Sequence, residues 1–373
     1  MNTSKERLTI FLPGLYDGGA ERTLLNLAEG IAAKGFPVDL LLSRAEGAYM
    51  DEIPESVRVI DLKAPRVLMC LPALVRYLRR ERPTAMLATL YANIVAVWAR
   101  KITGIPYRLV LNEQNTLTSV SNGEKDLRWK LYPELAKWFY PWADGVTAVS
   151  QGVADDLILA TRLPSCDVQV IYNPIVTSDL QKKSEAPLEH PWFRSGEPPV
   201  ILGVGRLTAQ KAFDVLIESF CQVRKSQRAR LLILGEGEER PRLEALIKRL
   251  GLEQDIALPG FVSNPYPFMA QAALFVLSSR WEGLPTVLVE AMSLRTAVIA
   301  TDCPSGPREI LRGGQYGPLV PVDDAEALAQ AIQNFMVNRP LCPDEESWKP
   351  YELDFVTDQY LSMLLGVPSS EEI

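Results

Sequence analysis

Residues 273–292 read ALFVLSSRWEGLPTVLVEAM, and their pattern predicts how most of the chain is built. Residues 273–277 form an apolar run of strand length, and the more polar residues 278–284 then predict a loop. Pro285 suits the first residue of a helix, because the N–H that proline lacks would have no partner there. The stretch therefore predicts a buried strand, a loop and a helix in direct succession.

The same alternation of apolar runs of strand length and amphipathic segments of helix length recurs almost throughout the sequence. This pattern is typical of parallel sheets built from βαβ units. The expected strands span residues 8–12, 38–42, 57–60, 85–88, 107–111, 145–149, 168–171, 199–205, 230–234, 256–259, 274–277, 297–300 and 317–320. Helices are expected over residues 20–34, 150–160 and 351–366.

The length of the chain predicts two domains, because 373 residues exceed the size of about 250 to 300 at which a single core stops growing. We predict an α/β fold with two Rossmann-like, doubly wound parallel-sheet domains facing a cleft, and ligands bind such sheets at the carboxyl ends of their strands. The predicted parts are an N-terminal domain over residues 1–178, a polar linker over 179–198, a C-terminal domain over 199–345 and a final helix over 346–373 that could pack back on the N-terminal domain.

Composition narrows the class of protein. Hydrophobic residues make up 47% of the chain and charged residues 23%, which is ordinary for a globular protein, and no run of eighteen apolar residues is present. The net charge of −7 argues against nucleic acid as the main partner. Residues 1–175 hold 20 Lys and Arg against 19 Asp and Glu, whereas the remainder holds 19 against 27, so the first half is the better candidate for meeting an anionic surface.

Cysteine and histidine usage excludes several kinds of site. The five cysteines are scattered without metal-ligand spacing, which favours reduced thiols over disulfides or zinc. The single histidine, His190, falls in the stretch expected to be a linker, so histidine-dependent triads and histidine-rich metal sites are close to excluded.

Two glutamates flank the Gly-Leu-Pro turn in the opening stretch, Glu282 in the expected loop and Glu290 about a turn and a half into the expected helix. A carboxylate can accept from both hydroxyls of a vicinal diol, and a helix start favours phosphate, so this combination suits a nucleotide sugar. The alternative is a dipole-stabilising glutamate in the first turn and a solvated one beside it.

Residues 282–290, EGLPTVLVE, resemble the signature of two glutamates with seven residues between them in the retaining glycosyltransferases of family 4, which have the two-domain GT-B fold. Other stretches agree in order along the chain: DGGAER at 17–22, GVGRLTAQKAFD at 203–214, LGEG at 234–237, LPGFV at 258–262 and CPSGPREI at 303–310.

The resemblance implies roles for these positions. Arg206 and Lys211 would hold the donor diphosphate and offset the charge on the leaving group, and Glu282 would contact the donor sugar; these three are the expected catalytic residues. Glu290 would hold the ribose hydroxyls. The remaining donor-binding positions that the resemblance implies are Gly18, Gly19, Gly205, Gly237, Phe261, Gly283, Leu284, Pro285 and Thr286.

No Asp-x-Asp triplet occurs, so we expect a metal-independent reaction with no cofactor, and the family implies retention of configuration. Many members have a histidine in the first domain near the donor sugar, whereas this chain has LNEQN at 111–115. Glu113 and Asn115 are therefore candidate contacts of the sugar or the acceptor, with a strand-end cap as the alternative.

Residues 125–142 mix cations with large aromatic side chains, and residues 76–82 carry further positive charge. The first segment could rest on a membrane surface, where tryptophan, tyrosine and cations settle; the alternative is a core-facing aromatic stripe with a basic solvent face. We expect a cytoplasmic protein, with the inner face of the cytoplasmic membrane as one location.

The resulting prediction is a transferase that moves a sugar from a nucleotide diphosphate sugar, UDP-linked by preference, to a glycan or lipid-linked glycan for a surface polysaccharide. A dehydrogenase is disfavoured, because Thr208 and Arg240 stand where its third glycine would belong. A sugar-nucleotide epimerase of similar shape and a binding protein without turnover remain the alternatives.

Overall fold

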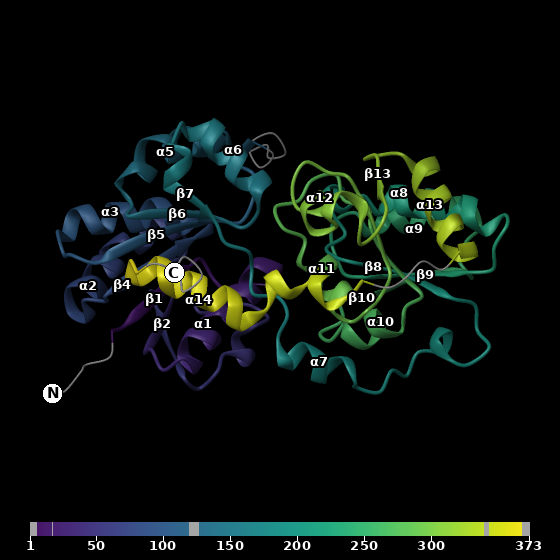
Figure 1. Cartoon of the computed structure of the whole chain (residues 1–373), viewed down its shortest axis with the longest axis horizontal. Coiled ribbons are helices and arrows are strands. Elements are labelled where there is room, and N and C mark those ends of the chain that lie inside the picture. The colour runs from purple at the N-terminus through teal and green to yellow at the C-terminus, as the bar shows by residue number, and fades with distance from the viewer. Residues whose placement is uncertain (1–5, 17, 119–126, 339–342, 368–373) are drawn as a thin grey trace. The chain divides into compact units, whose positions relative to one another are not determined.

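The computed structural model describes residues 6–16, 18–118, 127–338 and 343–367 and divides the chain into two compact units (Figure 1). The first unit contains the chain up to Ile175 together with the segment from Tyr351 onward, and the second contains Val176–Pro350. The segment expected to be a linker falls in the second unit, where it includes the short helix α7 (Ser178–Ser184).

The first unit is built on a parallel sheet of order β3-β2-β1-β4-β5-β6-β7. Its central strands are buried along their whole length, because helices cover both faces of a parallel sheet. The strands are β1 (Leu8–Leu12), β2 (Val38–Leu42), β3 (Val57–Asp61), β4 (Ala85–Thr89), β5 (Arg108–Glu113), β6 (Gly145–Ala148) and β7 (Val168–Val170). The helices are α1 (Gly19–Ala33), α2 (Leu71–Glu81), α3 (Asn93–Thr103), α5 (Leu127–Phe139) and α6 (Gln151–Thr161).

The last helix of the chain, α14 (Leu353–Leu365), belongs to the first unit and lies against α1 and β5 (Figure 1). Its residues Val356, Tyr360 and Leu364 are part of the apolar core there. The Tyr360 hydroxyl accepts a hydrogen bond from Asn112 Nδ2 at 2.9 Å, and Arg108 Nε donates to the Met363 carbonyl at 2.7 Å. Helix α14 is thus fixed to a strand some 250 residues earlier in the sequence.

The second unit has a parallel sheet of order β10-β9-β8-β11-β12-β13. The strands are β8 (Val200–Val204), β9 (Arg230–Leu234), β10 (Ile256–Gly260), β11 (Leu274–Leu277), β12 (Val298–Thr301) and β13 (Leu319–Val320). The other helices are α8 (Phe213–Arg224), α9 (Arg240–Leu250), α10 (Tyr266–Gln271), α11 (Thr286–Ser293), α12 (Pro307–Ile310) and α13 (Ala325–Asn338).

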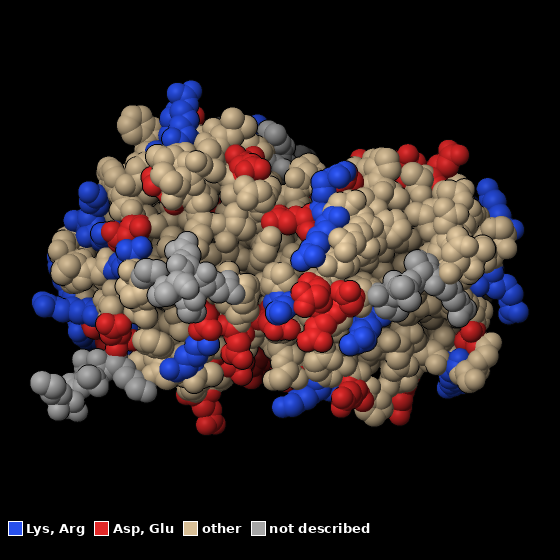
Figure 2. All heavy atoms as spheres, viewed as in Figure 1, with Lys and Arg blue, Asp and Glu red and all other residues tan. Residues whose placement is uncertain are grey.

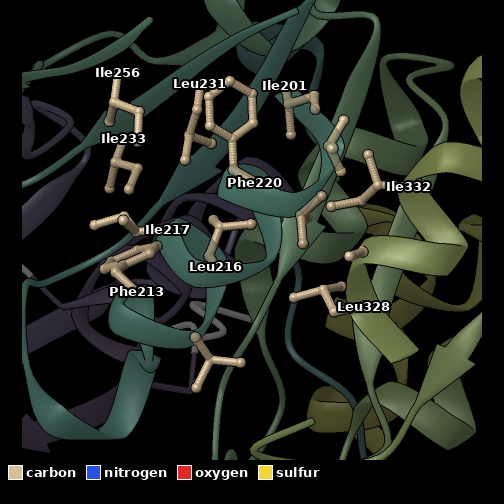
Figure 3. Packing of buried hydrophobic residues seen from close by; sticks show 14 of the residues in the cluster. Ile201, Phe213, Leu216, Ile217, Phe220, Leu231, Ile233, Ile256, Leu328 and Ile332 are labelled. Atoms are coloured by element: carbon tan, nitrogen blue, oxygen red, sulfur yellow. The ribbon is translucent and has the colours of Figure 1, made fainter. Parts of the chain in front are cut away.

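The core of the second unit forms where α8 packs on the sheet and on α13 (Figure 3). Phe220 of α8 lies against Leu231 and Ile201 of the sheet, and α13 adds Leu328 and Ile332. Each of these side chains is almost fully buried, and burial of such a side chain stabilises the fold by about 1.5–3 kcal/mol. This packing fixes the strands of the second unit and therefore the positions at which the loops after them begin.

The strand order places a switch point in the second sheet. Strand β8 is followed by β9 on one side, whereas its other neighbour, β11, is followed by β12 on the opposite side. The loops after β8 and β11 therefore begin side by side and lead away in opposite directions along the sheet. In open parallel sheets, ligands usually bind at such a point, at the carboxyl ends of the strands. The opening stretch of the sequence forms one of these two loops.

One local prediction about this stretch was wrong. Pro285 is not the first residue of α11 but the residue that precedes it, with φ −70° and ψ 97°, so the helix begins at Thr286. The extended ψ of Pro285 lets the chain turn from the loop into the helix axis, as a residue at the N-cap position must.

Candidate active site

The two loops at the switch point of the second sheet, residues 205–212 after β8 and 278–285 after β11, are hydrogen-bonded to each other. The N–H of Arg280 donates to the Gln210 carbonyl at 2.8 Å, and Gln210 Nε2 donates back to the Trp281 carbonyl at 2.9 Å. Ser278 Oγ donates to the Lys211 carbonyl at 2.8 Å. The loops thus form a single bonded surface at the edge of the sheet.

Lys211 and Glu282 meet on this surface. Lys211 Nζ donates to Glu282 Oε1 at 2.6 Å, and Ser279 Oγ donates to the same oxygen at 2.6 Å. The lysine side chain is 17% exposed and the glutamate side chain 7%, so the pair is largely shielded from water. An ammonium group has three N–H donors, and two remain beyond the one that Glu282 takes. Lys211 is therefore oriented by the carboxylate and still able to bind an anion.

Two glycines after β9 let a second loop lie directly against the first. A Cβ on Gly235 would fall 1.9 Å from the Gly205 carbonyl oxygen, and a Cβ on Gly237 would fall 2.3 Å from that of Leu207. Backbone hydrogen bonds close this contact, since Leu207 N donates to the Glu236 carbonyl at 2.8 Å. Only a residue without Cβ allows backbones to approach so closely.

The remaining predicted donor residues of the second unit lie at the same edge of the sheet. Gly283 and Leu284 are buried in the loop, where Ser305 Oγ donates to the Gly283 carbonyl at 2.9 Å. Glu290 is the fifth residue of α11 and is buried, whereas Phe261, directly after β10, is 54% exposed. Arg206 is exposed, and its guanidinium forms no hydrogen bond or ion pair with any side chain that the structure describes.

Cys303 is a residue near the site that the sequence did not single out. It is buried, and this burial, helped by the negative charge of nearby Glu282, raises the pKa of its thiol to about 12. The group therefore stays a neutral thiol at physiological pH and adds apolar surface beside the carboxylate. The signal in the sequence was its place at the start of the CPSGPREI motif.

A hollow of about 730 Å³ borders these loops and is lined in part by Arg280, Asp302 and Arg308. Its two arginines already have acidic partners, because Arg280 Nε donates to Asp323 at 2.7 Å and Arg308 Nε to Asp302 at 3.0 Å. Its charges are thus balanced within the protein, unlike the exposed Arg206.

In the first unit, Gly18 and Gly19 form the start of α1, with Gly18 as the residue before the helix and Gly19 as its first residue. Gly18 has no side chain with which to cap this helix start, and a Cβ on Gly18 would fall 2.2 Å from Glu21 Oε2, so the Glu21 carboxylate lies beside the first turn. The role that the resemblance implies for this helix start, contact with the donor, stays a prediction.

Glu113 is the last residue of β5 and lies in a buried polar cluster, where its side chain is largely shielded from solvent. One of its oxygens accepts hydrogen bonds from Asn93 Nδ2 at 3.0 Å and from the Tyr140 hydroxyl. Burial raises the pKa of Glu113 to about 7, although the hydrogen bonds from Tyr140 and Asn93 oppose this rise. Asn115, two residues on, is exposed and accessible to a ligand.

The surface formed by α3, α5 and the turn Tyr140–Trp142 is rich in exposed apolar side chains. Residues 125 and 126 and the side chains of 127–129 lie outside the described part of the chain. We name the following exposed residues the α3–α5 patch: Trp98, Ile102, Leu131, Leu135, Trp138 and Trp142.

The α3–α5 patch combines aromatic contacts with positive charge. The Phe139 ring lies 5.5 Å from that of Trp98 and 5.4 Å from that of Trp142, and Lys101 Nζ stands 4.6 Å above the Trp142 ring. Lys and Arg side chains also gather at the end of the unit that carries α2 and α3 (Figure 2). No helix among the described residues is long and apolar enough to cross a bilayer.

His190 has a structural place, as its position in the sequence suggested. Its Nδ1 accepts from the Trp192 N–H at 3.2 Å, and its ring contacts those of Trp192, Phe193 and Phe268. Burial lowers the pKa of the imidazole, so the ring is neutral at physiological pH. Of the cysteines, the four that the structure describes are unpaired.

Comparison with known proteins shows the family to which the chain belongs. Residues 17–179 match the family model described as Glycosyltransferase Family 4, and residues 198–338 match the one described as Glycosyl transferases group 1. A relative from Campylobacter jejuni is 31% identical over 344 residues, which cover 89% of this chain and 90% of the relative. The chain belongs to the family 4 glycosyltransferases.

That relative is named N-acetylgalactosamine-N,N'-diacetylbacillosaminyl-diphospho-undecaprenol 4-alpha-N-acetylgalactosaminyltransferase. A lipopolysaccharide core biosynthesis glycosyltransferase of Rhizobium meliloti is 27% identical, with 94% of this chain and 97% of the relative covered.

Solved structures show that this glycosyltransferase has the GT-B fold. A glycosyltransferase involved in lipopolysaccharide biosynthesis superposes with a TM-score of 0.75 at 16% identity and covers 96% of this chain and 100% of its own. An Anabaena protein in complex with UDP and glucose superposes with a TM-score of 0.71 at 19% identity, with 97% and 98% of the two chains covered.

Proposed function

We propose that this glycosyltransferase moves a hexose or N-acetylhexosamine from a UDP-linked donor to a lipid-linked glycan, with retention of configuration, in the synthesis of a surface polysaccharide. The observation that carries the proposal is the shielded Lys211–Glu282 pair at the switch point of β8 and β11, with Glu290 buried in the helix that follows. Cations for a diphosphate and carboxylates for diols thus occur at one sheet edge.

In this proposal the cations act on the leaving group. Lys211 and Arg206 bind the diphosphate and offset the negative charge that grows on it as the bond between the anomeric carbon and the phosphate oxygen breaks. Glu290 accepts hydrogen bonds from the ribose diol, and Glu282 contacts the hydroxyls of the donor sugar. Two cations supply the charge that a divalent metal supplies in other transferases, so we propose that the reaction needs no metal.

The donor and the acceptor are proposed from the relatives. The name of the Campylobacter jejuni enzyme specifies an acceptor linked to diphospho-undecaprenol, and the Anabaena protein was solved in complexes with UDP and with UDP-glucose. On the acceptor side, the exposed Asn115 is the better candidate contact, because Glu113 is engaged in the buried cluster.

The first test is a thermal-shift screen of UDP, GDP and ADP in EDTA, since a ligand that binds only the folded state raises the midpoint. We expect UDP alone to stabilise the protein. Transfer is then measured from UDP-glucose, UDP-galactose and their N-acetylated forms to a glycan on undecaprenyl diphosphate. Conversion of one UDP-sugar into another without acceptor would identify an epimerase, and binding without turnover would identify a binding protein.

We also propose that the α3–α5 patch rests on an anionic membrane surface, which would bring the enzyme to a lipid-linked acceptor. Tryptophan side chains settle at the level of lipid headgroups, and Lys101 and Lys130, both exposed, suit anionic lipid. Trp138 is 69% exposed, so its apolar surface lies in water unless a partner covers it.

Flotation with vesicles tests this surface. We expect binding to vesicles that contain phosphatidylglycerol and weaker binding to phosphatidylcholine alone or at high salt. Trp138→Ser should reduce binding several-fold, whereas Val337→Ser, at a residue 71% exposed on α13 of the other unit, should not. Equal binding by both variants would refute the patch as the contact.

A further inference from the structure

The loop that carries Lys211 is held in a conformation that it would not adopt unaided. Ala212, the next residue, has φ +49° and ψ +42°, a left-handed conformation that costs a residue with a Cβ about 1–2 kcal/mol. Residues in such conformations persist where the surrounding structure holds them, and they are concentrated at ligand sites. The contacts that hold this loop therefore bear on where the Lys211 ammonium lies.

Two of those contacts come from a single residue, Arg280, which also bonds to two other segments. Its Nη1 donates to the Ala209 carbonyl at 2.6 Å, in addition to the bond from its own N–H to Gln210. Its Nη2 donates to both oxygens of Asp214 at 3.2 Å, and its Nε donates to Asp323 at 2.7 Å. Arg280 therefore joins three segments: the loop of residues 205–212, which we name the lysine loop, the first turn of α8 and the segment after β13.

The geometry of these bonds requires a guanidinium group. Arginine presents its donors in a rigid planar fork, so three acceptors from three segments can be held in one plane. An ammonium at the end of a lysine chain has the same charge but not this fork. The side chain is 24% exposed, so these bonds are only partly screened by water.

We infer that Arg280 is a positioning residue for the transfer reaction, which acts by fixing the backbone on the N-terminal side of Lys211 so that the ammonium stays where Glu282 and the donor diphosphate need it. This inference rests on the proposed function of Lys211. Arg280 itself need not touch the donor, because its three kinds of donor atom are engaged with the protein.

The test compares Arg280→Gln and Arg280→Lys with Arg242→Gln. Among the described residues, the Arg242 guanidinium bonds to Asp214 at 3.1 Å and to Glu239 at 2.7 Å, and its side chain is 63% exposed. Its loss therefore removes ion pairs, one of them with the same Asp214, and no side-chain hydrogen bond to residues 205–212. The readouts are the Kd for UDP in EDTA, measured well below the unfolding midpoint, and the kcat of transfer. Each substitution is also made in a Lys211→Ala background.

We expect Arg280→Gln to raise the Kd for UDP about tenfold and to lower kcat by at least as much, because a small displacement of a catalytic group is costly. Arg280→Lys should have nearly the same effect as Arg280→Gln on the Kd for UDP and on kcat. Arg242→Gln should change the Kd and kcat by less than about twofold. In the Lys211→Ala background, Arg280→Gln should have almost no further effect on the Kd, since residues that act as a unit are non-additive.

A lower midpoint with an unchanged Kd for UDP would overturn the inference, and so would an equal effect of Arg280→Gln with and without Lys211. If Arg280→Gln does not fold, Asp323→Asn replaces it, because it removes one partner at an exposed carboxylate; it should raise the Kd about two- to fivefold. No binding of UDP, GDP or ADP to the wild-type protein would overturn the proposed function together with this inference. Weakened binding in Lys211→Ala alone would overturn only the inference.

Discussion

Replacing Glu113 with glutamine should flatten the pH dependence of the stability of the first unit. Glu113 is 4% exposed, and burial raises its pKa to about 7 from an ordinary value of 4.5, against the opposing hydrogen bonds from Tyr140 and Asn93. The folded protein therefore keeps a proton that the unfolded chain releases over this pH range. Glutamine keeps a carbonyl oxygen for the two donors but cannot ionise.

The sign and size of the effect follow from linkage. A raised pKa in the folded state means that stability is greatest below the unfolded pKa and is lost as pH rises through the folded value. A pKa that differs by one between the folded and unfolded states corresponds to about 1.4 kcal/mol of stability. The wild-type protein should therefore lose about 3 kcal/mol between about pH 4.5 and pH 7 on account of this carboxyl. The variant should keep that stability at about pH 8.

Hydrogen exchange at the amides of β5, corrected for intrinsic rates, measures the stability of the first unit at each pH. It does not require the two units to unfold in a single transition. The matched control is Glu134→Gln, which neutralises a carboxylate of α5 that is 66% exposed and whose contact with Lys137 spans 3.8 Å. We expect the stability of β5 in the control to depend on pH as in the wild-type protein. The stability of β5 in Glu113→Gln should be higher than in the wild-type protein at high pH. Parallel profiles for all three proteins would refute the reasoning.

Three further predictions concern single charges. Lys211→Ala should lower kcat about 100-fold and reduce the free energy of unfolding by about 1–3 kcal/mol, because a buried carboxylate loses its partner; kinetics and denaturant unfolding of one preparation check both. Glu290→Ala should raise the Kd for UDP about 10- to 100-fold through loss of the diol acceptor, as calorimetry would show, and unchanged affinity would contradict its assignment. Burial of Asp39 opposes its ionisation, yet hydrogen bonds from Arg58 and Tyr77 hold its pKa below the usual value. Asp39→Asn should therefore destabilise the protein near neutral pH. The difference should begin to shrink as pH falls below about 4, where the unfolded chain gains this proton, and should vanish only below the lower pKa of the folded state; denaturant unfolding across this pH range checks it.

The strands of both sheets were predictable from the sequence. Each expected strand is present, with ends that move by two residues or fewer, and several of them, such as 8–12, 38–42 and 230–234, have the predicted ends. The reason is that strands buried on both faces need unbroken apolar runs, and such runs stand out from the amphipathic helices between them. The start of α11 was misplaced by one residue because proline is accepted both at the N-cap and at the first helical position.

The sequence also indicated that the residues predicted to bind the donor would share one edge of the second sheet. Arg206, Lys211 and Glu282 all follow strands of one parallel sheet, and the carboxyl ends of parallel strands meet at the same edge. What no local pattern showed is that β8 and β11 are neighbours, which brings together residues 71 positions apart. The burial of Glu113 could not be predicted from the sequence either, because its hydrogen-bond partners Asn93 and Tyr140 come from other segments of the chain.

The sequence by itself therefore determined the class of fold, the order of strands and helices along the chain, and the types of charged residue after each strand, because these depend on short-range patterns of apolar and polar side chains. Only the tertiary structure decided which strands are adjacent, that Lys211 is held by Glu282 and its loop by Arg280, and that α14 returns to the first unit. These features depend on contacts between segments far apart in the sequence, and such contacts are selected by packing and hydrogen bonding of the whole unit rather than by any one stretch.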